Sequence, residues 1–389
     1  MNASFAFEPQ SVPLLDVTRA NAPLREELLA ALADVIDSAR FLHGPEVQQL
    51  ESQLAALCET RWAVGCASGS DAVLLSLMAL EVGAGDEVIV PSFTFFATAS
   101  AVWRMGAKIV FVDVDPKTFN IDPQQVAAAI TSKTKAVIPV HLFGQCAQLE
   151  SICDICAERG IHIVEDAAQA VGAKYRGRAA GSWGTTGCFS FYPTKNLGGC
   201  GDGGMITTSD DKLAERLRLL AGHGMKPRYV HKIVGINSRL DTIQAAALVV
   251  KLRHLARWTA ERQANARQYQ QLFEEAGLES TVQLPCSNAE CEHVWNQYTV
   301  RIPNGRRDEL RSHLTERGVG TEIYYPHSLH LQECFRSCGY GPGSLPVSEQ
   351  AALEVLSLPI FPALQLAEQR AVVGRIAEFF RGLRASTAA

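Results

Sequence analysis

Short apolar runs typical of buried strands alternate with helical segments from residue 62 to residue 208. After a strand–turn–helix at 62–80, strands are expected at 87–90, 108–113, 135–140, 161–166 and 203–208, with helices at 123–130 and 149–159. Repeated strand–helix units of this size indicate an α/β fold, with a mainly parallel sheet covered by helices on both faces. Ligands of such folds bind at the carboxyl ends of the strands.

The composition of the chain changes near residue 256, where a charged amphipathic helix begins at about 258–277. Further downstream we expect strands at 296–302 and 319–325, a helix between them at 306–317, and a terminal helix at 366–384. This pattern predicts a large domain at 1–255, which opens with an N-terminal arm, and a smaller C-terminal α/β domain at 256–389.

Charge and apolar patterning exclude several classes of partner. The 389 residues carry a net charge of −5 and no basic run, which argues against nucleic acid as a partner. The longest uncharged run, 88–103, is too short to span a membrane, and the N-terminus lacks the pattern of a secretory signal. Eleven scattered cysteines do not suggest disulfides or a metal site, and Cys153 and Cys156 are expected to pack in the core. We therefore expect a cytoplasmic protein without a bound metal.

Lys195 follows a short strand-like run, Phe189–Tyr192, and precedes a glycine-rich loop that extends from Gly198 to Gly204. A lysine held between aromatic side chains and a flexible backbone is partly removed from water, which lowers the pKa of its amine. The neutral amine can then act as a nucleophile or a base. The alternative interpretation is an ordinary surface lysine in a turn.

A carboxylate cluster ends the apolar strand that precedes this lysine. The segment reads Glu165-Asp166-Ala167-Ala168-Gln169, so an acidic residue lies where parallel sheets bind ligands. A buried carboxylate needs a cation or hydrogen-bond donors as partner, and a protonated pyridine nitrogen would serve.

The turn Ala67–Asp71 joins a strand to a helix and is rich in small residues. Backbone N–H groups in such a turn, together with the helix dipole, favour an anion such as phosphate. A serine or aspartate at this place is also an ordinary helix N-cap, so the turn alone does not decide between the two.

These segments together resemble the DegT/DnrJ/EryC1/StrS family of nucleotide-sugar aminotransferases, which use pyridoxal 5′-phosphate (PLP). Glu165–Gln169 and Ser190–Lys195 carry the likeness, which extends over nearly the whole chain. The resemblance implies the type I fold of PLP-dependent transferases and a homodimer with shared active sites.

The resemblance also implies roles for individual residues. Lys195 would hold PLP as an imine and then transfer protons as base and acid. Asp166 would pair with the pyridine nitrogen, Gln169 would lie near the ring hydroxyl, and Phe95 would stack on the ring. The residues implied to hold the phosphate are Ser70, Asp71 and Ser190 of one subunit and Asn237 of the partner subunit.

Four residues are candidates for substrate binding: His141, Arg239, Tyr325 and His330. His141 opens a segment, HLFGQ, that resembles family members acting at the sugar C3 position, although it could equally be a structural histidine that caps the loop. Tyr325 and His330 belong to a loop that resembles the family loop closing over the sugar nucleotide, although they could merely pack the domain junction. Arg239 follows Asn237 in the loop before a long helix.

The resemblance thus implies transfer of an amino group, from glutamate, to a keto group of a nucleotide-linked sugar in amino-sugar biosynthesis. Two alternatives remain. One is different PLP chemistry on the same scaffold, either dehydration of a sugar or amination of a cyclitol. The other is a non-catalytic regulatory protein that has kept the fold. Because relatives that dehydrate replace the lysine with histidine, the presence of Lys195 disfavours dehydration.

Overall fold

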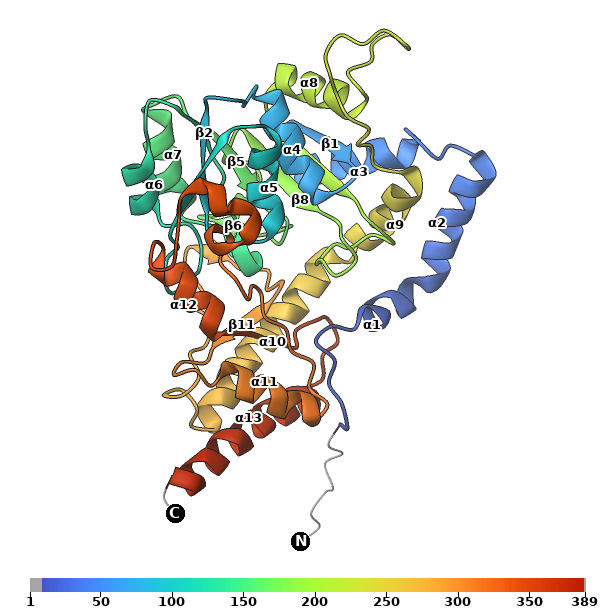
Figure 1. Ribbon diagram of the computed structural model, residues 1–389. Coiled ribbons are helices and arrows are strands. Elements are labelled where there is room, and N and C mark those ends of the chain that lie inside the picture. Colours follow the sequence, from blue (N-terminus) through green and yellow to red (C-terminus); the bar gives the residue numbers. More distant parts are fainter. Residues whose placement is uncertain (1–8, 388–389) are drawn as a thin grey trace.

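The computed structural model describes residues 9–387, and a seven-stranded sheet forms the centre of its larger part (Figure 1). The strand order is β1-β9-β8-β5-β4-β2-β3. The strands are β1 (Trp62–Cys66), β2 (Glu87–Pro91), β3 (Lys108–Val112), β4 (Thr134–Val137), β5 (His162–Asp166), β8 (Thr186–Ser190) and β9 (Gly204–Thr208). Only β9 runs antiparallel to its neighbours, which confirms the expected mainly parallel sheet.

Helices cover both faces of this sheet because successive side chains of a strand point to opposite sides. In β2, Val88 and Val90 point to the face where residues of α4 (Gly69–Ala79), α5 (Phe96–Arg104) and α8 (Asp211–Ala221) complete one apolar cluster. Ile89 points the other way, toward α6 (Pro123–Ala129) and α7 (Leu149–Ala157). On that side, α3 (Pro45–Leu57) and α9 (Thr242–Leu252) pack against β1, β8 and β9. The strands therefore consist mainly of buried residues, as expected of a covered parallel sheet.

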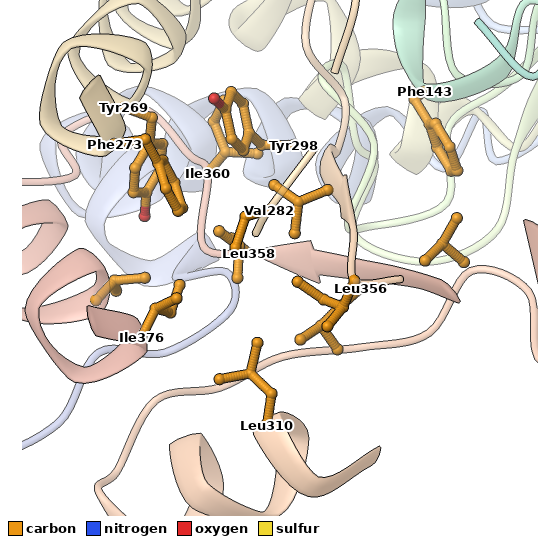
Figure 2. Packing of buried hydrophobic residues seen from close by; sticks show 14 of the residues in the cluster. Phe143, Tyr269, Phe273, Val282, Tyr298, Leu310, Leu356, Leu358, Ile360 and Ile376 are labelled. Carbon is orange, nitrogen blue, oxygen red and sulfur yellow. The ribbon is translucent and has the colours of Figure 1, made fainter. Parts of the chain in front are cut away.

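The C-terminal part is built around the long helix α10 (Leu255–Glu275) and a two-stranded sheet. Its elements are β11 (Tyr298–Arg301), α11 (Arg307–Glu316), α12 (Pro346–Glu354), β12 (Val355–Leu358) and α13 (Leu366–Thr387). Figure 2 shows its core, where Tyr269 and Tyr298 stack with ring centroids 4.9 Å apart. Phe143, which follows β4, belongs to the same cluster, so this core extends to the loop at the end of β4 in the large sheet.

The predicted strand at 319–325 is wrong, because β11 pairs with β12 instead. Residues 319 and 322 form only isolated bridges, the first with Val12 and the second with Ser357. The run is rich in residues that favour strands, but its backbone hydrogen bonds go to separate partners and no ladder forms. β12 escaped prediction because all four of its residues are buried and none marks an alternation.

An N-terminal arm lies against the C-terminal part of the chain (Figure 1). The backbone N–H of Val12 donates to Gly318 at 2.8 Å, and Arg19 forms a two-pronged ion pair with Glu368 at 2.7 Å. The arm, which belongs to the predicted domain 1–255, makes these contacts with residues of the predicted domain 256–389. The division into these two domains remains a prediction.

The arm continues into α1 (Val17–Asn21) and α2 (Arg25–Ser38), which are separated by a short 3-10 helix, η1 (Ala22–Leu24). The remaining short elements are β6 (Lys174–Tyr175), β7 (Arg178–Ala179), β10 (Cys291–Glu292), η2 (Leu142–Gly144), η3 (Leu329–Leu331) and η4 (Glu333–Cys338). No helix within residues 9–387 combines the length and apolar character needed to cross a membrane. The prediction that the N-terminus lacks a secretory signal concerns residues 1–8, which lie outside the described residues.

Candidate active site

Lys195 and Asp166 lie at the same edge of the large sheet. β5 ends at Asp166 and pairs in parallel with β8, where Asp166 is the register partner of Cys188. Lys195 lies in the turn that follows β8, and its backbone N–H donates to Tyr192 at 2.9 Å. Burial lowers the pKa of the Lys195 amine to about 8, and the nearby charge of Asp166 acts in the opposite direction. The expected amine and carboxylate are therefore brought together, and a substantial fraction of the amine is neutral near physiological pH.

The Asp166 carboxylate is buried and accepts two hydrogen bonds. Thr98 Oγ1 donates to Oδ2 at 2.7 Å, and the Ala168 N–H donates to Oδ1 at 3.2 Å. No basic side chain of residues 9–382 lies within ion-pair distance of it. A carboxylate oxygen can accept further bonds, so Asp166 has capacity left for a cationic group of a ligand. Thr98 was not predicted as a site residue, because its only signal in the sequence is a hydroxyl group in an otherwise apolar helical turn.

Glu165 points to the other side of the strand and is fully buried there. Its carboxylate accepts four hydrogen bonds, from the backbone N–H groups of Gly181, Trp183 and Gly184 at 2.7–2.8 Å and from Nε2 of His141 at 2.9 Å. Nδ1 of His141 faces the Ala147 N–H at 3.3 Å, which assigns the ring proton to Nε2. Both ring nitrogens of His141 thus have partners within the protein, and its side chain is fully buried. This geometry favours the structural alternative over substrate contact.

The N-terminus of α4 lies directly against Ser190. A Cβ atom added to Gly69 would meet the Ser190 Cβ at 2.6 Å, so this close approach requires glycine. Ser68 caps the helix by accepting from the Asp71 N–H at 3.1 Å, and Ser70 is exposed beside it. Three predicted phosphate residues, Ser70, Asp71 and Ser190, therefore gather around one helix N-terminus, which is suited to an anion.

Phe95 and Tyr325 form one wall of this region. Phe95 directly precedes α5, its side chain is 55% exposed, and its ring centroid lies 6.0 Å from that of Tyr325. Gln169 Nε2 donates to the Tyr325 hydroxyl at 3.3 Å. Burial and the charge of Asp166 raise the pKa of Tyr325. The structure thus brings Phe95, Gln169 and Tyr325 to the edge where Asp166 lies.

His330 lies within a different set of contacts. Its Nδ1 is 2.6 Å from Ser92 Oγ, and its Nε2 is 3.1 Å from Glu349 Oε1. The side chain is buried, and burial lowers its pKa. These contacts favour the alternative in which His330 packs the junction between the two parts of the chain.

Asn237 and Arg239 follow the loop that projects beyond α8 (Figure 1). Asn237 is exposed, and its side chain makes no hydrogen bond to the part of the chain that the structure describes. Arg239 lines a cavity of about 510 Å³ together with Arg61, Trp62 and Arg218, away from the residues that surround Lys195. Within one chain, the structure therefore does not add these two residues to the candidate site.

The assembled groups suit a flat cofactor with an anionic end, a cationic ring atom and an aldehyde. The helix N-terminus at Ser70 offers donors to the anion, Asp166 faces the cation, and Phe95 offers a ring face. Lys195 supplies an amine that can react with the aldehyde. The donor set therefore fits PLP.

Comparison with known proteins gives a consistent result. Residues 23–377 match the model of the DegT/DnrJ/EryC1/StrS aminotransferase family. A protein of Geobacillus stearothermophilus called pleiotropic regulatory protein is 52% identical, over 95% of this chain and 99% of its own. The dTDP-3-amino-3,4,6-trideoxy-alpha-D-glucose transaminase of Streptomyces venezuelae is 46% identical, over 96% of this chain and 97% of its own.

Solved structures agree with the fold. DesV of S. venezuelae superimposes with a TM-score of 0.91 at 46% identity, covering 95% of this chain and 98% of its own. The NtdA structure from Bacillus subtilis, which contains the cofactor PMP, has a TM-score of 0.90 at 30% identity. It covers 97% of this chain and 87% of its own. The large parallel sheet and the smaller C-terminal part are therefore those of PLP-dependent aminotransferases.

Proposed function

Because the chain belongs to the DegT/DnrJ/EryC1/StrS aminotransferase family, we propose that it transfers an amino group to a keto group of a nucleotide-linked sugar. It is a PLP-dependent aminotransferase. One observation in the structure carries this conclusion: an amine with a lowered pKa lies at the same sheet edge as a buried carboxylate that has no basic partner among the side chains of residues 9–382. A purely structural ion pair would not leave the amine partly neutral at pH 7.

Each protein group has a distinct role in this reaction. Bound PLP supplies an electron-accepting ring that stabilises negative charge on the carbon next to the transferred nitrogen. Lys195 would hold the cofactor through its amine and, once released, would move the proton as base and then acid. Asp166 keeps the ring nitrogen protonated, and Thr98 fixes the orientation of that carboxylate. The α4 N-terminus and Ser190 bind the phosphate.

Amination at C3 of the sugar is the proposed regiochemistry. The name of the S. venezuelae relative places the amino group at C3 of a dTDP-linked sugar, and that relative matches 96% of this chain. The HLFGQ segment at 141–145 also resembles family members acting at C3. His141 itself is enclosed behind β5, so it acts on this specificity by shaping the loop and makes no contact with the sugar.

Glutamate as donor, a homodimer and a cytoplasmic location complete the proposal. The projecting loop exposes Tyr229, Val230 and Val234, with 76%, 51% and 90% of each side chain accessible, and it leads to the exposed Asn237. Such a loop supports contact with a second copy that shares its active site. All eleven cysteines are free, which supports a reducing compartment.

The decisive experiment is to incubate the purified protein with PLP, glutamate and a panel of nucleotide-linked 3-keto and 4-keto sugars, together with a cyclitol ketone. Mass spectrometry should show an aminated sugar from the 3-keto substrate, with equimolar 2-oxoglutarate, and the product should be absent with Lys195→Ala. Loss of water from the sugar would instead support dehydration, and amination of a cyclitol ketone would support the other PLP chemistry.

The name of the G. stearothermophilus relative favours a regulatory role as the second candidate. A protein that takes up no PLP, remains colourless and yields no borohydride-trapped adduct on Lys195 would support this role. It would contradict the aminotransferase proposal.

A further inference from the structure

A segment of the C-terminal part, His293–Asn296, connects the loop after β4 with Asn196, the residue next to Lys195. It follows β10 and precedes β11, and the side chains of His293, Val294 and Asn296 are all buried. Its backbone binds the loop after β4, where Val294 N–H donates to Gly144 at 3.0 Å and Asn296 N–H donates to Phe143 at 2.9 Å. The close fit leaves no room for a Cβ at Gly144, since it would lie 2.9 Å from the Val294 side chain.

A continuous chain of hydrogen bonds connects Gln169 with the residue next to Lys195. Gln169 Oε1 accepts from the Phe143 N–H at 2.6 Å, and the Phe143 carbonyl accepts from the Asn296 N–H. Asn296 Nδ2 then donates to Asn196 Oδ1 at 3.0 Å. Asn196 Nδ2 in turn donates to the Val294 carbonyl at 2.8 Å, so Asn196 is bound to the His293–Asn296 segment by two hydrogen bonds. Both are buried, with 8% and 7% of Asn196 and Asn296 exposed, so water does not compete for these bonds.

Two bulky residues of this network have left-handed backbone conformations. Phe143 has φ of 59° and Trp295 has φ of 49°, values that side chains of this size rarely adopt. Such conformations persist only where the surroundings hold them, and they concentrate at functional sites. Phe143 is held by its hydrogen bonds to Gln169 and Asn296. Trp295 is held by Arg262, whose Nη1 donates to the Trp295 and Ile360 carbonyls at 3.0 Å each.

Arg262 is itself unusual, because it is buried and forms no ion pair with a carboxylate of residues 9–387. Burial lowers its pKa to about 10. Burying a cation that donates only to backbone carbonyls lowers the stability of the fold. In this protein, the buried Arg262 fixes the backbone of the His293–Asn296 segment.

We propose that Asn296 is a positioning residue for the transamination: through Asn196 it fixes the direction of Lys195, and through Phe143 it fixes Gln169. This inference rests on the proposed function, since it assigns a task to the segment only if Lys195 carries PLP. Because Asn296 belongs to the C-terminal part of the chain, the distance between the Lys195 amine and Gln169 depends on how that part is placed. Small displacements of a reacting group reduce rates strongly, so a fixed Lys195 has a direct kinetic value.

The test uses the PLP-loaded enzyme and the variants Asn296→Ala, Asn296→Leu, Asn196→Ala and the double variant Asn196→Ala/Asn296→Ala. Asn296→Leu keeps the branched shape of the side chain and removes the donor. Asn265→Ala is the matched control, because Asn265 also binds a backbone carbonyl, that of Phe361 at 3.0 Å, but lies outside the chain of hydrogen bonds. For each variant we would measure kcat, KM and the pH midpoint of the visible absorbance of bound PLP.

We expect kcat to fall about tenfold in the Asn296 variants while KM for the sugar changes less than about twofold. The absorbance midpoint should move by at least about 0.5 pH unit, because the surroundings of the Lys195 nitrogen change. The double variant should match Asn196→Ala, since both lack the same pair of bonds. Asn265→Ala should retain the wild-type midpoint.

A midpoint and kcat in Asn296→Leu equal to those of the control, or effects that simply add in the double variant, would overturn the proposal. Should Asn296→Ala fail to fold, Asn296→Leu and Asn196→Ala still decide the question. A wild-type protein that binds no PLP would contradict the proposed function itself, whereas loaded wild type with unaltered variants contradicts only the role of Asn296.

Discussion

The lowered pKa of Lys195 allows a quantitative prediction for the cofactor-free protein. An ordinary lysine amine has a pKa of 10.5, and burial lowers that of Lys195 to about 8. At pH 7 about one Lys195 amine in ten is therefore neutral, against roughly three in ten thousand for an ordinary lysine. The same difference represents about 3 kcal/mol of unfavourable free energy for keeping Lys195 protonated inside the folded chain.

The sign of the effect on stability follows from proton binding. The folded state binds the proton of Lys195 less readily than the unfolded chain, so the protonated amine destabilises the fold at pH values below 8. The penalty decreases as the pH rises above 8 and is lost above 10.5, where the amine becomes neutral in both states. Replacing Lys195 by methionine should therefore raise the free energy of unfolding by about 3 kcal/mol at pH 7, about 2 kcal/mol at pH 9 and less than about 1 kcal/mol at pH 10.

Urea unfolding of the PLP-free wild type and of Lys195→Met at these three pH values would measure the effect. Lys117→Met serves as the control, because Lys117 is exposed and its replacement should leave the difference near zero at every pH. A gain of the same size at pH 7 and pH 10 would show that it comes from apolar packing. A variant less stable than the wild type at pH 7 would refute the argument that Lys195 is desolvated.

Three further predictions concern the neighbours of this lysine. Thr98→Val removes the donor at 2.7 Å from Asp166 and should raise the PLP dissociation constant about tenfold, measured by absorbance titration; an unchanged constant would contradict its role. Gly69→Ala places a Cβ 2.6 Å from the Ser190 side chain and should weaken PLP binding. Gly83→Ala, whose added Cβ meets no atom within 4 Å, is the control and should leave PLP binding unchanged. Equal PLP binding by both variants would argue against the phosphate site. His141→Ala removes one donor from the buried Glu165 carboxylate, so it should lower the free energy of unfolding, measured by denaturant titration, by about 2 kcal/mol. KM for the sugar should stay unchanged. A raised KM with normal stability would instead support a role of His141 in substrate binding.

The sequence was most informative where chemistry and periodicity coincide. The apolar run ending in Asp166 and the lysine after β8 predicted a shared sheet edge, and the structure places both there. Because parallel strands all end at the same edge of a sheet, residues that follow two such strands lie at that edge whatever their side-chain contacts are.

Residues whose role depends on a partner distant in sequence could not be assigned in this way. Thr98 binds Asp166 across 68 positions, and Asn296 binds Asn196 across 100, so neither spacing carries a signal. The sequence predicts His141 at a strand end and His330 in a loop, but only the structure shows that their ring nitrogens are already bound. The false strand at 319–325 has the same origin, since its first residue pairs with the arm at Val12.

The contacts of the N-terminal arm have a consequence for the order of events during synthesis. Arg19 leaves the ribosome early, but its partner Glu368 lies 349 positions later, and Arg375 binds the carbonyl of Pro9 across 366 positions. The large sheet from β1 to β9 can form while translation continues, but the arm cannot complete its contacts until the last helix has emerged, because Glu368 and Arg375 belong to that helix. The first segment made is therefore among the last to settle, and a nascent chain stalled before α13 would expose the apolar face around Val12 to chaperones.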